Sequence, residues 1–354
     1  MERLDALRRQ LQGEGRDAFL VSNPLNVAYV SGFTGTAGLL LITEKEAYLL
    51  TDFRYVEQAQ QQAPAFKTID AKGKLWQVAH TLLVDAGCKI LTVEADHLTV
   101  DTYEKIVAAL DELVVEGIAS PVAKLRTIKS PAEIAAITAA QKLTDAAFTH
   151  ILSFIKPGMR EREIALELEF MMRKNGASGL SFEMIVGSGS RAALPHGVAS
   201  AKELLVGDAV VLDFGCIVNG YCSDMTRTVF VGQASAKQRE VYQAVLAAQQ
   251  AALDKLRAGL SGQQADALAR DVLVAAGFGE QFGHGLGHGV GREIHEAPRL
   301  SPTAEDILAT GMIVTVEPGV YLPGEFGVRI EDMVVIEENG IRNITVSSKE
   351  LFCV

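Results

Sequence analysis

The sequence predicts an α+β protein in which a smaller α/β domain, residues 1–122, is followed by a linker, 123–129, and a larger domain, 130–354. Three observations indicate this arrangement. Helix-like and strand-like stretches alternate over the first third of the chain, a strongly marked helix start follows at Ser130, and the remainder contains two similar units. A chain of 354 residues is also long enough for two domains of roughly 150 residues each.

The first domain shows short elements of both types. The stretch LDALRRQLQ, residues 4–12, has apolar residues at helical spacing. DAFLVSN reads as a strand that ends at Asn23-Pro24. GLLLITEKEAYLLTD, residues 38–52, reads as two strands around a charged turn at Glu44–Glu46. These alternations predict a compact α/β domain.

The start of the second domain carries three agreeing signals. Ser130 is a suitable N-cap, Pro131 occupies the first helical position, and Glu133 stands where a capping box needs an acid. The apolar residues that follow predict a long helix over 130–155.

Two glycine-bounded stretches of equal length suggest an internal repeat. Gly158 and Gly176 enclose one helix-like stretch, and Gly259 and Gly277 enclose another. A long helix precedes each, over 130–155 and about 235–257.

A matched pair of carboxylates supports the repeat. Asp213 lies between Gly207 and Gly215 at the same spacing as Glu317 between Gly311 and Gly319. Chance spacing of common glycines is the alternative. We expect two similar halves, each helix–helix–strand, with a site at their junction.

Composition argues against several functional classes. The formal net charge of −11 disfavours binding to nucleic acid or to an anionic membrane. No apolar run approaches the roughly 18 residues of a membrane span, and the amphipathic start MERLDALRRQLQGEG lacks the apolar core of a signal peptide. The four cysteines form no C-x-x-C pair, so we expect a reduced, cytoplasmic protein.

VVLDFGCIVNGYCSDMTRTVFV predicts a β-hairpin with Asn219-Gly220 as its two-residue turn. In that register Asp213 faces Thr226, and Asp224 lies diagonally from Asp213 on the same face, roughly 7–8 Å away at Cα. Two carboxylates among apolar strand residues repel each other unless a cation or proton intervenes. A metal site is favoured over a pair of edge residues.

Further candidate ligands lie in the C-terminal part. FGHGLGHGVGREIHEAP concentrates histidines on a glycine-rich segment, which allows close approach of the backbone. Glu317 ends the apolar strand IVTVE. GVRIEDMVVI reads as one strand on which Arg329 and Glu331 share a face. This pair is either a surface ion pair or an arginine that supports a ligand glutamate.

The resulting candidate ligand set is oxygen-rich. It favours Mn²⁺, with Co²⁺ or Zn²⁺ as alternatives, over a thiolate zinc site. Four carboxylates exceed the usual need of one catalytic ion, so two divalent metal ions roughly 3.5–4 Å apart would neutralise them. The predicted metal ligands are Asp213, Asp224, His288, Glu317 and Glu331.

Residues 130–354 resemble the pita-bread metallopeptidases, and the whole chain resembles their Xaa-Pro peptidase branch, aminopeptidase P and prolidase. The resemblance implies a C-terminal pita-bread domain with an internal pseudo-two-fold repeat after a three-layer α/β domain. The motifs that carry it are SGFTG at 31–35, TDFRY at 51–55, PHG at 195–197, LDFG at 212–215, SDMTRT at 223–228, GHGLGH at 283–288, IHEAP at 294–298, EPGVY at 317–321 and VRIED at 328–332.

The resemblance also implies how the ligands share two ions. Asp213 binds one ion, His288 and Glu317 bind the other, and Asp224 and Glu331 bridge them. The ions lower the pKa of a shared water that attacks the scissile carbonyl. Glu317 also carries a proton to the leaving proline nitrogen.

Other roles follow from the same resemblance. His196 and His295 are catalytic and stabilise the tetrahedral intermediate. His284 lines the substrate pocket, and Tyr321 and Arg329 support ligands and substrate. The first domain is expected to cap the site, to favour short peptides and to help form a homodimer.

We expect an exopeptidase that cuts Xaa-Pro bonds in short peptides with proline at position two. An Xaa-Pro aminopeptidase is slightly favoured because the chain is short, and an Xaa-Pro dipeptidase is the alternative. Arg299 would grip the free carboxylate of proline in a dipeptidase, or it is a surface residue. A methionine aminopeptidase and a catalytically inactive pita-bread binding protein are weaker alternatives, because the first domain is present and all five ligand positions hold competent side chains.

Overall fold

The computed structural model, which describes residues 2–354, shows a chain that forms two compact units dividing between Arg126 and Thr127. The segment expected as a linker, 123–129, is instead largely helical, because it continues α6 (Pro121–Thr127). Pro121 suits the first turn of this helix, and Lys124 and Arg126 suit its last turn.

The first unit is a three-layer α/β domain. Its six-stranded sheet has the order β4-β3-β2-β1-β5-β6, with antiparallel β1–β2 and β2–β3 pairs and parallel pairs elsewhere. The strands are β1 (Ala18–Val21), β2 (Leu39–Thr43), β3 (Ala47–Thr51), β4 (Lys67–Asp70), β5 (Ile90–Glu94) and β6 (Val114–Ile118). The helices before α6 are α1 (Glu2–Gly13), α2 (Pro24–Ser31), α3 (Val56–Gln62), α4 (Leu75–Asp85) and α5 (Val100–Ala109).

Apolar side chains leave this sheet on both faces, which explains the three layers. Phe19 and Leu40 pack with α1 to α3 in one core, whereas Leu20 and Leu41 pack with α4 and α5 in another. Neighbouring strand residues point to opposite faces, so both faces need a helical cover. The predicted helix over 4–12 and the three predicted strands are confirmed.

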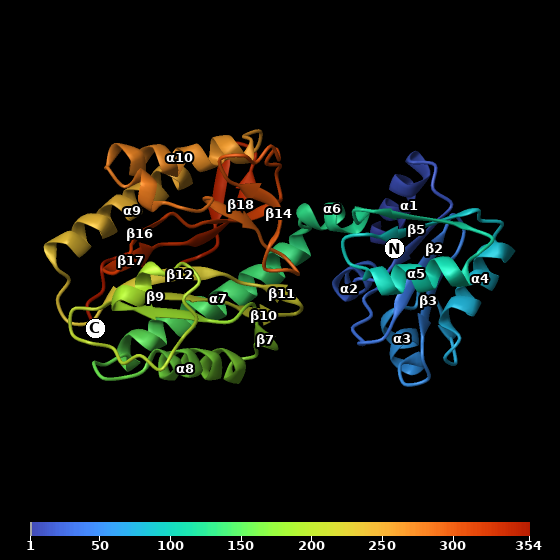
Figure 1. Ribbon diagram of the computed structural model, residues 1–354, viewed down its shortest axis with the longest axis horizontal. Coiled ribbons are helices and arrows are strands. Elements are labelled where there is room, and N and C mark those ends of the chain that lie inside the picture. The colour runs from blue at the N-terminus through green and yellow to red at the C-terminus, as the bar shows by residue number, and fades with distance from the viewer. Residues whose placement is uncertain (1) are drawn as a thin grey trace. The chain divides into compact units, whose positions relative to one another are not determined.

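The second unit consists of two halves of matching design (Figure 1, green and yellow for the first, orange and red for the second). The first half contains α7 (Pro131–Phe154), α8 (Glu161–Lys174), η1 (Gly189–Ala193) and the strands β7 (Gly179–Leu180), β8 (Ile185–Ser188), β9 (Ala209–Phe214), β10 (Cys216–Val218), β11 (Tyr221–Cys222) and β12 (Met225–Phe230). The second half contains α9 (Ala236–Lys255), α10 (Gly262–Ala275), η2 (Gly279–Gln281) and the strands β13 (Gly287–Gly289), β14 (Glu296–Leu300), β15 (Ile313–Val316), β16 (Gly319–Leu322), β17 (Phe326–Arg329), β18 (Asp332–Glu337) and β19 (Gly340–Asn343).

Each half has its own apolar core, one between α7, α8 and the β8–β9–β12 sheet, the other between α9, α10 and the strands of the second half. The predicted capping box at Ser130 is present, with both hydrogen bonds to Glu133. Ser235 and Ser261 form equivalent capping boxes on α9 and α10. The helices thus begin where the local sequence directs them to begin.

The predicted hairpin is confirmed in its register. Asn219 and Gly220 both have positive φ, 52° and 76°, as a type I′ turn requires. On β9 and β12, Asp213 lies opposite Thr226. The strands β10 and β11 extend the hairpin into a small separate sheet with β7.

The stretch GVRIEDMVVI is two strands rather than the one expected. β17 ends at Arg329 and pairs with β16, whereas β18 begins at Asp332 and pairs with β15 and β19. The chain changes sheets at Ile330-Glu331 because the main chain there bonds elsewhere: Glu331 N donates to Thr226 O in the first half (3.1 Å). This leaves Glu331 at a junction between the halves.

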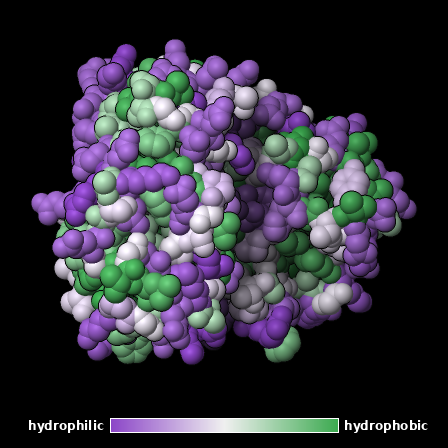
Figure 2. Space-filling model, turned by 60° about the vertical axis from the view of Figure 1, so that its left-hand side comes forward, coloured by the Kyte–Doolittle hydropathy of each residue, from purple (hydrophilic) through white to green (hydrophobic). Residues whose placement is uncertain are grey.

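The described residues contain no helix that is both long and apolar enough to cross a membrane. On the face displayed in Figure 2, hydrophilic residues surround smaller apolar patches. Exposed apolar surface of this extent is usual on proteins and indicates no particular function by itself.

Candidate metal centre

Both halves of the second unit line one cavity of about 740 Å³. The cavity therefore lies at the junction of the two halves, where the sequence predicts a site. The cavity wall includes all residues predicted as metal ligands or catalytic histidines: His196, Asp213, Asp224, His288, His295, Glu317 and Glu331.

Three of the predicted ligands converge most closely. Asp224, His288 and Glu331 each offer a ligand atom, and these atoms lie within 4.8 Å of one another. His288 Nε2 is 3.6 Å from Asp224 Oδ2 and 3.3 Å from Glu317 Oε1. Asp224 precedes β12, His288 lies on β13, Glu317 follows β15 and Glu331 precedes β18. The cluster therefore forms at strand ends from both halves.

Asp213 is held by an arginine. Arg329 Nη2 donates to Asp213 Oδ2 across the cavity wall, and both side chains are buried. From the sequence, Arg329 is either in a surface ion pair or a support for the ligand Glu331. The structure pairs it with Asp213, another predicted ligand. Arg329 does not bond Glu331 because the chain changes sheets at Ile330-Glu331, which turns Glu331 toward Thr226. The Thr226 hydroxyl donates to Glu331 Oε2 (2.7 Å).

Burial and mutual repulsion dominate the electrostatics of the cluster. Burial, and then the negative charges of Glu331 and Asp213, raise the pKa of Asp224 well above its usual range. Burial and the charges of Glu317 and Asp213 raise the pKa of Glu331 in the same way. Burial also raises the pKa of Glu317. The carboxylates resist ionising together unless positive charge is supplied.

The imidazole of the cluster is suited to coordinate a metal. Burial lowers the pKa of His288, so its ring is neutral near pH 7. Thr315 on β15 connects it to Glu317: the Thr315 hydroxyl accepts from His288 N (3.0 Å) and donates to Glu317 Oε1 (2.9 Å). One side chain thus aligns two predicted ligands.

Tyr321 lies behind the cavity wall rather than on it. Its hydroxyl is 2.8 Å from His284 Nε2 and accepts from Arg329 Nη1 (2.7 Å). Burial raises its pKa to about 12, so it stays a neutral phenol. Tyr321 therefore orients His284 and Arg329, both of which line the cavity.

The glycines of the segment FGHGLGHGVGREIHEAP bring backbone close to backbone. A Cβ on Gly287 would stand 2.1 Å from the carbonyl oxygen of Thr315. Only glycine lets β13 lie against β15 and so carry His288 into the cluster.

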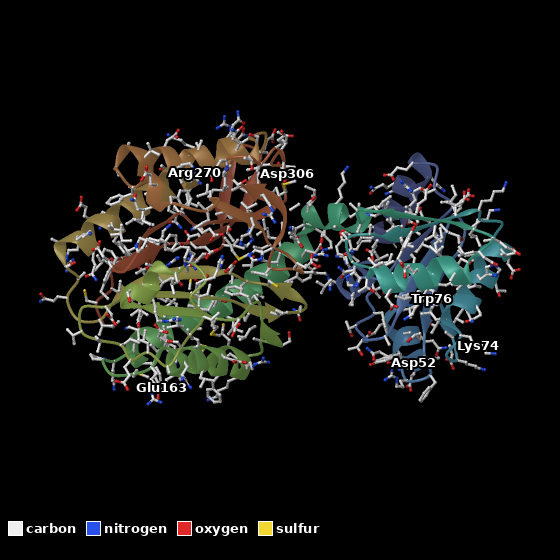
Figure 3. The ribbon with its side chains drawn as sticks, in the orientation of Figure 1. Asp52, Lys74, Trp76, Glu163, Arg270 and Asp306 are labelled. Atoms are coloured by element: carbon white, nitrogen blue, oxygen red, sulfur yellow. The ribbon has the colours of Figure 1, made fainter. Side chains whose placement is uncertain are left out.

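A partly buried ion pair on α10 holds the backbone of the same segment. Asp266 and Arg270 form a two-bonded pair of 2.6 and 3.0 Å. Arg270, which Figure 3 labels, donates to the carbonyl oxygens of Phe282 (2.9 Å) and His284 (2.6 Å), and Asp266 accepts from Leu286 N (2.9 Å). Helix α10 thus determines the path of the backbone that carries His284.

The remaining predicted residues lie on more open parts of the wall. His295 stands beside His288 with ring centroids 4.3 Å apart, and burial lowers the pKa of His295. His196 is exposed in the loop after η1, on the side of the first half. Arg299 is also exposed on the wall, and among residues 2–354 no carboxylate pairs with its guanidinium.

Sequence reasoning missed several supporting residues. Thr226 and Thr315 could have been found, since each is two residues from a predicted ligand and so on the same strand face. Asp266 and Arg270 are spaced i, i+4 on a helix, where an ordinary surface pair is the default expectation. Only the fold shows what they contact.

The residues present fit a divalent cation. Within the described chain, the buried oxygens Asp213 Oδ1 and Glu331 Oε1 have no hydrogen-bond partner. Buried carboxylate oxygens without a partner are costly, and a bound cation removes that cost. Together with the neutral His288 they form an oxygen-rich donor set of the kind that harder divalent ions prefer.

Comparison with known proteins gives a consistent result. A model of metallopeptidase family M24 matches residues 135–338, and a model of the creatinase/prolidase N-terminal domain matches residues 3–128. An Xaa-Pro dipeptidase of Pyrococcus furiosus is 38% identical over 357 residues, with 99% of each chain covered.

Two solved structures are closely similar. An Xaa-Pro dipeptidase from Bacillus anthracis has a TM-score of 0.98 at 47% identity, with coverage of 100% of this chain and 99% of the other. An X-Pro aminopeptidase from Thermotoga maritima has a TM-score of 0.91 at 40% identity, with coverage of 96% and 98%.

Replacing Gly287 should disturb the cluster. We expect Gly287→Ala to destabilise the protein by about 1–3 kcal/mol and to weaken divalent-metal binding, because the new methyl group collides with Thr315. Gly283→Ala is the matched control, since a Cβ there meets nothing within 4 Å. Thermal unfolding and metal titration of both variants test this, and equal behaviour of the two would contradict it.

Metal stabilisation should depend on pH. The raised pKa values of Asp224, Glu317 and Glu331 mean that their protonated forms stabilise the metal-free fold below about pH 4. This contribution is lost as the pH rises through the raised folded-state values. A divalent ion replaces the protons, so the increase in Tm on adding Mn²⁺ should grow between about pH 5 and pH 8.

The size of that increase is also predictable. At a free Mn²⁺ concentration 100-fold above Kd, each site adds about 2.7 kcal/mol to the free energy of unfolding, or roughly 5–10 °C in Tm. Unfolding scans with Mn²⁺ and with a chelator measure it at each pH. Asp224→Asn should abolish most of the difference, and a metal effect independent of pH would show that the cluster does not bind the ion.

Proposed function

The chain belongs to metallopeptidase family M24, and on this premise we propose that it is an exopeptidase that hydrolyses Xaa-Pro bonds and acts chiefly on Xaa-Pro dipeptides. The observation that carries the proposal is the convergence of four carboxylates and a neutral imidazole on one cavity. The residues proposed to hold two divalent ions are Asp213, Asp224, His288, Glu317 and Glu331.

When bound, such ions would polarise the scissile carbonyl and lower the pKa of an attacking water. Glu317 is the proposed proton carrier. Burial raises its pKa, and Thr315 holds one of its oxygens, so the other is available to take a proton from water and give it to the leaving nitrogen. Proline nitrogen lacks an N–H in the peptide and must gain a proton to leave.

The histidines are proposed to stabilise charge on the substrate. His295 is neutral near pH 7 because burial lowers its pKa, and a neutral imidazole can donate one hydrogen bond to the oxygen on which negative charge develops. His196 would contact the same region from the first half. Tyr321 would act indirectly, by orienting His284 and Arg329.

The sequence alone slightly favours an aminopeptidase, but the similar proteins and the cavity wall support a dipeptidase more strongly. Dipeptidases are among the similar proteins at 38% and 47% identity, and an aminopeptidase is among them at 40%. The exposed guanidinium of Arg299 on the cavity wall is suited to the free carboxylate of proline. A longer peptide presents a neutral amide at that position.

We also propose Mn²⁺ as the preferred metal, with Co²⁺ or Zn²⁺ as alternatives, because the donor set is dominated by carboxylates. A homodimer is proposed on the resemblance alone, and a cytoplasmic location on the cysteine pattern. Light scattering of the purified protein tests the homodimer.

Substrate length and Arg299 can be tested together. We expect Xaa-Pro to be cut at least 10-fold faster than Xaa-Pro-Yaa, and Arg299→Ala to raise KM for Xaa-Pro by about 10–100-fold because a charged hydrogen bond is lost. Hydrolysis of the uncharged Xaa-Pro amide should change little. Arg257→Ala, which removes an exposed arginine outside the cavity, is the control. Faster cutting of tripeptides, with no effect of Arg299→Ala, would favour the aminopeptidase.

Metal content separates an enzyme from an inactive relative. We expect about two divalent ions per chain by elemental analysis, loss of activity on chelation, and recovery with Mn²⁺. Asp224→Ala should lower kcat by at least about 100-fold. A protein that binds no metal and cuts no proline peptide would point to the catalytically inactive alternative.

A further inference from the structure

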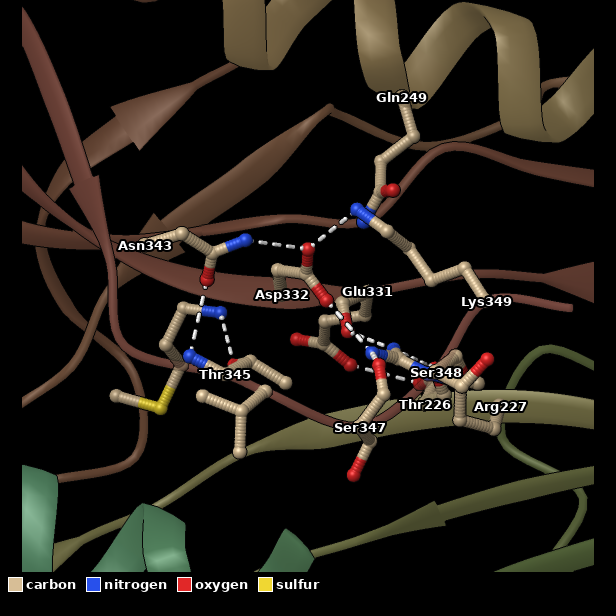
Figure 4. Close-up of polar contacts among 12 residues, drawn as sticks. Thr226, Arg227, Gln249, Glu331, Asp332, Asn343, Thr345, Ser347, Ser348 and Lys349 are labelled. Carbon is tan, nitrogen blue, oxygen red and sulfur yellow. Dashed lines mark hydrogen bonds and ion pairs between the residues drawn. The ribbon is translucent and has the colours of Figure 1, made fainter.

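A second buried arginine lies directly behind the predicted bridging ligands. Adjacent strand residues point to opposite sides, so Thr226 turns toward Glu331 while Arg227 turns away from it. Arg227 there meets Asp332, the residue after Glu331, with 2.8 Å between Nη2 and Oδ1. Arg227 is 1% exposed and Asp332 is fully buried. Figure 4 shows this pair together with Glu331 and Thr226.

The guanidinium of Arg227 connects two segments that belong to different sheets. Nη1 donates to the carbonyl oxygens of both Thr226 (2.9 Å) and Glu331. β12 and β18 share no ladder, since β12 pairs with β9 and β18 with β15 and β19. One backbone bond, from Glu331 N to Thr226 O (3.1 Å), joins the two segments, and the guanidinium adds a side-chain bridge to both of their carbonyl oxygens.

The C-terminal segment completes this arrangement. Nη2 of Arg227 donates to Ser347 O (2.8 Å), and Nε donates to Ser348 O (3.1 Å). Lys349 Nζ pairs with Asp332 Oδ2 at 2.7 Å. With the bonds to Thr226, Glu331 and Asp332, all five N–H donors of the guanidinium are used. A lysine at this position has fewer donors and no planar fork.

The C-terminal segment is also attached to the first half. Ser347 N and its hydroxyl both donate to Asp145 Oδ1 on α7, at 3.0 and 2.5 Å. Tyr242 on α9 donates to the carbonyl oxygen of Glu350 (3.1 Å). Residues 347–350 therefore contact helices of both halves.

We propose that Arg227 and Asp332 are positioning residues that hold Asp224 and Glu331 at the separation needed to bridge two metal ions, and that Ser347 to Lys349 complete this support. The inference rests on the proposed dinuclear site. Stability alone is a weak explanation, because an apolar pair can often replace a buried ion pair without loss. Position is the stronger argument: the guanidinium binds the main chain at Glu331 itself and at Thr226, two residues from Asp224.

The test compares metal-free Arg227→Met, Arg227→Lys and Lys349→Met with the unmodified chain during titration with Mn²⁺. Equilibrium dialysis counts bound ions, and electron paramagnetic resonance distinguishes a coupled Mn²⁺ pair from isolated ions. We expect Arg227→Met to weaken binding of one ion by about 10–100-fold and to lose the coupled signal. Arg227→Lys should recover only part of the affinity, and Lys349→Met should cause a smaller loss. In steady-state assays kcat should fall while KM changes little.

Arg342→Met is the matched control, because it removes an arginine from a half-exposed ion pair with Glu337 on the same sheet. It should bind both ions normally. If Arg227→Met still binds two ions and gives the coupled signal, the inference is overturned, however much the Tm falls. The proposed function would remain intact. If Arg227→Met does not fold, Lys349→Met provides the test. Unchanged Mn²⁺ binding by Lys349→Met would then overturn the inference. An unmodified chain that binds no ion would instead refute the proposed function.

Discussion

Repulsion among four carboxylates in one cavity is the constraint on which this structure depends. Asp213, Asp224, Glu317 and Glu331 come from strand ends in both halves, and burial raises the pKa of three of them. Arg329 is hydrogen-bonded to Asp213, and its single charge offsets only part of the repulsion among the other three. The remaining negative charge requires protons or cations, and that requirement links the fold of the second unit to the chemistry of a metallopeptidase.

The paired halves make such a cluster possible. Each half places a carboxylate near the end of a central strand, and the cavity lies where those strand ends meet. Small residues allow the approach of the backbones, as Gly287 does beside Thr315. The hydroxyl groups of Thr226 and Thr315 then satisfy one oxygen each on Glu331 and Glu317, which leaves the second oxygen free for a metal or a proton.

Support for the cluster comes from charged pairs that never touch it. Asp266 and Arg270 hold the backbone beside His284, and Arg227 and Asp332 join the main chains beside Glu331. Both arginines act on carbonyl oxygens, which fixes the backbone rather than the ligand side chain. In a close-packed interior a small shift of backbone moves a ligand atom by a comparable distance, so residues far from the substrate can control metal geometry.

The sequence alone determined the features that depend on neighbours in the chain. The capping box at Ser130, the hairpin register that opposes Asp213 and Thr226, and the carboxylate–glycine spacing of the two halves are local patterns. Only the tertiary structure decided the partner of Arg329, the change of sheet at Ile330-Glu331, and the place of Tyr321 behind the wall. These features depend on contacts between segments far apart in the chain. There the energy of burying a charge outweighs local preference, so residue spacing in the sequence does not predict the partners.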